Sequence, residues 1–163
     1  MRAYEISEIR EFTSHLFAGE AFDTLLMAEA EFHTRSAFFL KGKLDPDFLE
    51  PEEENPEGYI SWREVKPICF SIIRGKRLPK SFKIVFKMGR TFSQRWLREQ
   101  GASPENTGEL FWNIRYQKKK LHLISSFSYK SFTLDKALER AWDDSTRLLF
   151  KKIGIVLIET GRH

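Results

Sequence analysis

The first apolar pattern in the chain has a period of two and runs from residue 25 to residue 44. Apolar residues occupy every second position up to Phe32, and Phe38, Leu40 and Leu44 keep the same parity after a polar turn. Alternate residues of a strand point to opposite faces. The segment therefore predicts an antiparallel hairpin with one buried face and one charged face.

Two later segments show the same period. Residues 81–88 predict one strand, and residues 109–132 predict a second hairpin whose two-residue turn is Lys118-Lys119. Lysine is a poor residue for such a turn, since primed turns favour Asn-Gly. The strand buries Phe82, Ile84, Phe86 and Met88. In the hairpin the inward pairs are Tyr116 with Leu121, Ile114 with Leu123, Trp112 with Ser125 and Leu110 with Phe127.

Four other segments repeat apolar residues every three or four positions, which predicts helices within residues 7–19, 61–75, 91–101 and 133–154. Each begins with a hydroxyl residue suited to an N-cap: Ser7, Ser61, Thr91 and Thr133. The second helix has the widest apolar face, including Ile68, and is expected to lie at the centre of the core. Pro67 removes a backbone donor beyond its first turn, so a kink or a restart is expected there.

The order of these elements predicts the fold class. Helices alternate with antiparallel pairs, which indicates an α+β fold. We expect an antiparallel sheet of about five strands, made of two hairpins plus a middle strand, with about four helices packed mainly on one face. Residues 155–158 are a candidate short edge strand. The length of 163 residues predicts a single domain over residues 1–163.

Charge is distributed unevenly along the chain. Residues 1–60 have a net charge of −9, and residues 61–163 have a net charge of +13. Seven acidic residues fall in residues 45–58, an acidic Pro-rich segment that we predict to be an exposed loop with Phe48 and Leu49 pinned to the core. The two halves either neutralise each other within the fold or leave a basic surface for an anionic partner.

Nine cations form the candidate binding surface. The first group follows the helix that ends near Gly75, where cations also suit the helix dipole. The last group is a three-lysine hairpin tip, which a solvated, aggregation-resistant turn would also explain. The candidate residues are Arg74, Lys76, Arg77, Lys80, Arg95, Arg98, Lys118, Lys119 and Lys120.

Local motifs for catalysis are missing from the sequence. It has no nucleophile elbow, nucleotide-binding glycine pattern or metal-ligand spacing. A less favoured interpretation is a hydrolase or transferase whose site is assembled in space from Glu29, Glu31, His33 and His122. No catalytic residue, metal ligand or cofactor is therefore assigned.

The cellular setting follows from composition. Cys69 is the only cysteine, which fits a reducing compartment and predicts a buried, unreactive thiol. The charged start MRAYEISEIREF does not match a signal peptide, and no apolar run approaches the ~18 residues of a membrane span. We expect a cytoplasmic protein with no membrane partner.

Three stretches of the chain resemble a known family. They are Trp62–Phe70 continued by Gly75–Lys83, then Phe132–Lys136, and Ala141–Asp143. The chain is similar there to an uncharacterised family of small single-domain bacterial proteins from clostridia-like organisms, a domain of unknown function. The resemblance extends over nearly the whole chain. It implies no activity, cofactor or catalytic residue.

Two interpretations of function remain open. The first is a non-catalytic binding domain whose basic surface contacts an anionic partner such as nucleic acid. The second is a protein–protein interaction or self-assembly module in which the acidic loop meets a basic surface. An outward-facing aromatic residue for stacking on bases is not evident in the sequence, which weakens the first.

Overall fold

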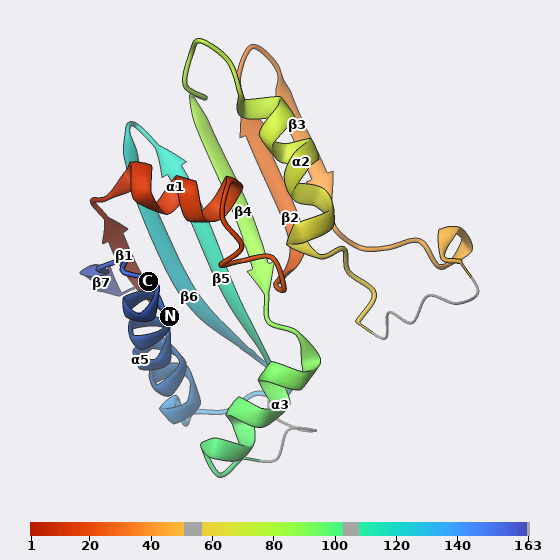
Figure 1. The fold of residues 1–163 in the computed structure, drawn as a ribbon. Helices are drawn as coiled ribbons and strands as arrows, with labels where there is room; N and C mark the ends of the chain where they lie inside the picture. Colours follow the sequence, from red (N-terminus) through yellow and green to blue (C-terminus); the bar gives the residue numbers. More distant parts are fainter. Residues whose placement is uncertain (51–56, 103–107, 163) are drawn as a thin grey trace.

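The computed structural model describes residues 1–50, 57–102 and 108–162, and its centre is one antiparallel sheet of seven strands in the order β3-β2-β4-β5-β6-β1-β7 (Figure 1). The strands are β1 (Arg2–Ile6), β2 (Leu26–His33), β3 (Ala37–Lys41), β4 (Ser81–Lys87), β5 (Gly108–Gln117), β6 (Lys120–Tyr129) and β7 (Ile158–Arg162). The helices are α1 (Ile9–Phe17), α2 (Trp62–Ile73), α3 (Arg90–Glu99) and α5 (Ala137–Lys152), with a short 3₁₀ turn, η1 (Pro46–Phe48).

The fold class is α+β with an antiparallel sheet, as predicted, but the sheet has seven strands and not about five. β1 was missed because Arg2 and Glu5 give this short segment a charged appearance. Its Tyr4 and Ile6 are nevertheless buried beside β6. β7 begins at Ile158, where the predicted edge strand was expected to end. The two segments pair with each other and extend the sheet beyond the second hairpin.

The second hairpin forms in the predicted register, including the pairs Trp112–Ser125 and Tyr116–Leu121. Its turn consists of Lys118 and Lys119, with φ angles of 53° and 61°. A left-handed conformation at both central residues is the type I′ turn that matches the twist of the two strands. The strand pairing has therefore imposed on two lysines a backbone conformation that suits Asn-Gly.

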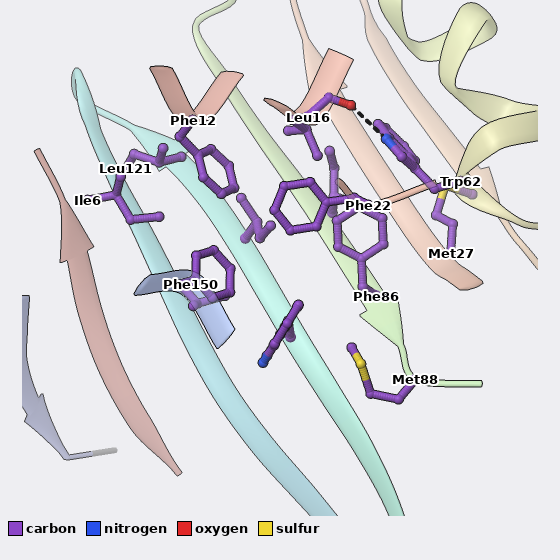
Figure 2. Close-up of a cluster of buried hydrophobic side chains, with 14 of the residues drawn as sticks. Ile6, Phe12, Leu16, Phe22, Met27, Trp62, Phe86, Met88, Leu121 and Phe150 are labelled. Carbon is purple, nitrogen blue, oxygen red and sulfur yellow. Dashed lines mark hydrogen bonds between the residues drawn. The ribbon is translucent and has the colours of Figure 1, made fainter. Parts of the chain in front are cut away.

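The helices contribute their buried side chains to one face of the sheet. Figure 2 shows the centre of this core, where Phe22 stacks on Phe86 at 5.8 Å between ring centroids. The indole N–H of Trp62 donates to the carbonyl of Leu16 at 2.7 Å and joins α2 to the end of α1. All three rings lie almost entirely out of solvent. Burial of several large aromatic side chains supplies the main stabilisation of such a layer.

The predicted start of α2 is confirmed, and those of the other helices are not. Ser61 accepts a hydrogen bond from the backbone N–H of Glu64 at 3.3 Å. Ser7, Thr91 and Thr133 are not N-caps, since α1, α3 and α5 start after Glu8, Gly89 and Lys136 without a side-chain cap. At α3 the carboxylate of Glu57 binds the backbone N–H of Arg90 instead. α2 continues through Pro67 without a restart.

Several apolar residues lie outside the predicted core. Ile68 on α2 is 52% exposed, and Phe48 is 84% exposed rather than pinned to the core. Met27 is buried although its parity predicted the outer face, because a register irregularity between Met27 and Glu29 shifts the phase of β2. Residues 51–56 of the acidic loop and residues 103–107 lie outside the described part of the chain.

Candidate functional site

A groove of about 960 Å³ lies at the end of the sheet where β4 begins. Two connections form its walls: the β2–β3 turn, and the loop from the end of α2 to β4 (Figure 1). Five cations line it, and every charged residue of the lining is positive. They are Arg35, Arg74, Lys76, Arg77 and Lys80.

Strand pairing brings these two connections together. β2 and β4 are neighbours, with His33 opposite Ser81. The backbone N–H of Lys80 donates to the carbonyl of His33 at 2.8 Å, just before β4 begins. The turn with Arg35 and the loop with Arg74–Lys80 therefore meet at one edge, although they are about 40 residues apart in the sequence.

The cations of the groove lack acidic partners. In residues 1–50, 57–102 and 108–162, no carboxylate lies within ion-pair distance of any of the five. Attraction to the dipole of α2 explains only Arg74, its C-cap residue, because this effect fades within the last helical turn. Helix termination is therefore an incomplete explanation of the groove.

The lysine hairpin tip lies at the same end of the sheet. Gln117 pairs with Ser81 on one side and with Lys120 on the other, so the turn follows next to the start of β4. Lys118, Lys119 and Lys120 are all exposed. A left-handed backbone costs a non-glycine residue about 1–2 kcal/mol. The turn therefore keeps positive charge where Asn-Gly would be more stable.

Arg95 and Arg98 belong to another part of the molecule. Both lie on α3, which follows β4, whereas the groove lies where β4 starts (Figure 1). The guanidinium of Arg95 sits over the ring of Phe92 at 5.8 Å. The structure thus gathers seven of the nine predicted cations at one end of the sheet and leaves these two at the other.

Sequence reasoning missed two residues of the groove. Arg35 lies in the hairpin turn of the acidic half, so its proximity to the basic half depends on the β2–β4 pairing. Phe38 was predicted to be buried, but β3 is an edge strand and leaves this ring 41% exposed on the groove wall. It supplies the outward-facing aromatic ring that the sequence pattern did not reveal. The predicted β2–β3 hairpin placed Arg35 at a turn, but it placed Phe38 on the buried face, so the sequence held no signal for that residue.

The alternative active site does not assemble. Glu31 and His33 are within 3.9 Å of each other on β2, but His122 lies on β6, with β4 and β5 between. Three strand spacings are about 14 Å. The side chain of Glu29 accepts hydrogen bonds from Lys83 and Lys41, which lower the pKa of its carboxyl. A general acid needs the opposite shift.

Other chemistry is also limited in the described part of the chain. Cys69 is fully buried, and desolvation raises the pKa of its thiol to about 12, which makes it a poor nucleophile. The described residues contain no group of three or more His, Cys, Asp or Glu side chains placed to hold a metal ion. No helix among them has both the length and the apolar character needed to cross a membrane.

The fold and the site define a class of protein: an α+β domain with an antiparallel sheet, helices on one face and a basic groove at one end. The chain belongs to a family described as a family of unknown function (DUF5721), whose model matches residues 15–157. No curated protein and no solved structure matches the chain.

Proposed function

We propose that this chain is a non-catalytic binding domain that contacts single-stranded nucleic acid through the groove of Arg35, Arg74, Lys76, Arg77 and Lys80. The observation that carries the proposal is the set of five cations around one cavity, none of which has a carboxylate partner within the part of the chain that the structure describes. Like charges gathered without counter-charges repel each other. A phosphate backbone would remove that repulsion and release its own counterions.

Phe38 and the hairpin tip support a nucleic acid over a simple anion. An exposed ring beside cations offers a stacking surface for a base, and base stacking contributes about 1–3 kcal/mol. Lys118, Lys119 and Lys120 extend the positive surface from the groove across β4 and β5. A strand of several nucleotides matches this length of surface better than one phosphate does.

The experiment is a fluorescence anisotropy titration of a labelled oligothymidine and an oligouridine of about 20 nucleotides, from about 50 mM to about 200 mM salt. Five neutralised phosphates predict a slope of log K against log salt of about −3.5 for a single strand. Absence of binding at low salt, or binding with no salt dependence, contradicts the proposal. Tighter binding of a duplex than of either single strand would reject the stacking role of Phe38.

A second candidate function rests on the acidic segment that follows β3. Its described part carries Asp45, Asp47 and Phe48, and it projects beyond the edge of the sheet (Figure 1). Phe48 is 84% exposed beside these acids. An exposed aromatic flanked by carboxylates complements the basic groove of a second copy, which has an apolar wall at Phe38 and Leu78. The segment is therefore a candidate for self-association.

Light scattering across a protein concentration series tests the self-association. The expected result is a mass that rises with concentration and returns to that of a monomer in Phe48→Ser. The exposed position makes this substitution harmless to folding, so the variant is a fair control. A strict monomer at all concentrations contradicts this second function and leaves the nucleic-acid proposal standing.

The proposal includes one domain over residues 1–163 in the cytoplasm of a bacterial cell. The buried thiol of the single cysteine suits a reducing compartment. Limited proteolysis tests the single domain, because a chain with a second domain would release a stable fragment. Cell fractionation tests the cytoplasmic location, and recovery of the protein outside the cytoplasm would contradict it.

A further inference from the structure

A second cavity, of about 590 Å³, lies beyond the other end of β4. Its walls come from the α1–β2 connection, α3 and the last turn of α5, and its depth is apolar. Figure 2 shows three of its lining residues, Phe22, Met88 and Phe150, on the face of the sheet that the helices cover. The cavity does not share a residue with the basic groove.

The rim differs in character from the depth. The exposed residues that line the mouth are Ala21, Thr24, Thr91, Arg95 and Lys152. No carboxylate in the described residues lies within ion-pair distance of Arg95 or Lys152. The one acidic lining residue, Glu57, binds the backbone N–H of Arg90 at the start of α3. The mouth therefore presents two cations above an apolar interior.

Among the described residues that line this cavity, no buried side-chain polar atom lacks a hydrogen-bond partner. Trp112 lines the cavity, and its indole N–H already donates to the hydroxyl of Thr146 at 2.9 Å. A molecule that fills this space needs an apolar body. The volume lies within the range of about 300–1,000 Å³ that is usual for small-ligand sites, where a few polar groups at one end fix the orientation.

We propose that this cavity binds a small amphipathic carboxylate, such as a medium-chain fatty acid, with its tail against Phe22, Trp112 and Phe150 and its carboxylate at Arg95 and Lys152. Arg95 is the residue suited to the head group, since a guanidinium forms paired hydrogen bonds with a carboxylate. Its position over the Phe92 ring, at 5.8 Å, holds it at the mouth. The site is independent of nucleic-acid binding.

Calorimetric titration with dodecanoate below its micelle concentration tests the proposal. The expected result is one molecule bound per chain, with dodecanol bound at least about tenfold more weakly and dodecyltrimethylammonium not bound. Trp112 emission should change on binding, because this ring lines the cavity. Absence of dodecanoate binding, or equal affinity for dodecanoate and dodecanol, overturns the proposal.

Matched variants on one helix locate the ligand. Arg95→Ala should weaken dodecanoate binding about tenfold, since the carboxylate loses its hydrogen bonds to a charged guanidinium. Arg98→Ala removes the same charge from α3 outside the cavity and should change the affinity less than about twofold. Ala21→Trp, at the exposed mouth, should block entry. Equal effects of the two arginine variants, or unchanged binding in Ala21→Trp, would show that the ligand lies elsewhere.

Discussion

Two clusters of charge in this protein behave in opposite ways. In one, Asp143 on α5 is 3% exposed and accepts a hydrogen bond from the Ser125 hydroxyl at 2.5 Å. The Met1 amine lies 3.6 Å from the same carboxylate, and the Arg2 guanidinium lies 3.9 Å from it. In the other cluster, the cations of the basic groove are exposed and have no carboxylate partner among the described residues.

The charges around Asp143 hold elements of the fold together, whereas the charges of the groove are available to bind a partner. The Asp143 network joins β1, β6 and α5, so its charges are balanced inside the fold. Among the described residues the side chains of the groove cations form no such links, and like charges repel one another in the free protein. Removing charge should therefore destabilise the fold at Asp143 and leave it unchanged, or more stable, at the groove and the hairpin tip.

The largest expected effect is at Asp143. Asp143→Ala leaves the buried Ser125 hydroxyl without its acceptor. It also removes one of several carboxylates near the Met1 amine and the Arg2 guanidinium, which keep their contacts with Glu139 and Asp144. The free energy of unfolding should fall by up to about 3 kcal/mol. Urea denaturation measures this change. Nucleic-acid affinity of the folded variant should stay within about twofold. A loss below about 1 kcal/mol, or a specific loss of affinity, would remove the contrast between the two clusters.

The second prediction is a smaller change in the free energy of unfolding, and here the variant is more stable than the original protein. Replacing Lys118-Lys119 by Asn-Gly relieves two left-handed lysines and should raise the free energy of unfolding by about 1–2 kcal/mol. The same change removes two cations from the hairpin tip and should weaken oligonucleotide binding. Denaturation and anisotropy on one preparation measure both. Higher stability with unchanged affinity would exclude the tip from the binding surface.

The Lys118-Lys119 turn shows which features of the fold a sequence pattern can predict and which it cannot. The period of two gave the hairpin and every pair of its register, because a one-residue shift would expose the whole apolar face. The strained backbone of Lys118 and Lys119 follows from that register and not from the residues themselves. In the same way, Ser61 was a reliable cap, whereas at Arg90 a carboxylate from a distant segment replaced the expected local cap.

The site was less predictable than the fold. The run Arg74–Lys80 is visible in the sequence as a cluster of charge. Arg35 and Phe38 join it only through the pairing of β2 with β4 and the position of β3 at the sheet edge. Arg95 and Arg98 looked equivalent to the other cations, but β4 separates them from the groove. The order of the strands in the sheet decides which cations lie on the same surface. The sequence pattern did not predict that order.

The smallest effect concerns pH. Hydrogen bonds from Lys83 and Lys41 place the pKa of Glu29 below its ordinary value of 4.5. This carboxylate therefore stabilises the folded state above that pH, and the contribution is lost as the pH falls through the lowered pKa. In Glu29→Gln the decline in stability on acidification should be shallower by less than about 1 kcal/mol, since the pair is partly exposed. Urea unfolding at pH 6 and at more acidic pH measures it, and identical profiles would contradict it.

The most direct test of the account compares two equal changes of charge at the two ends of β4. One variant carries Lys76→Glu and Arg77→Glu in the groove, and the other carries Arg95→Glu and Arg98→Glu on α3. The groove variant should lower affinity for the single-stranded oligonucleotide at least about tenfold and reduce the magnitude of the salt slope by about 1.4. The α3 variant should change affinity less than about threefold. Equal losses in the two variants would contradict a binding site at the groove.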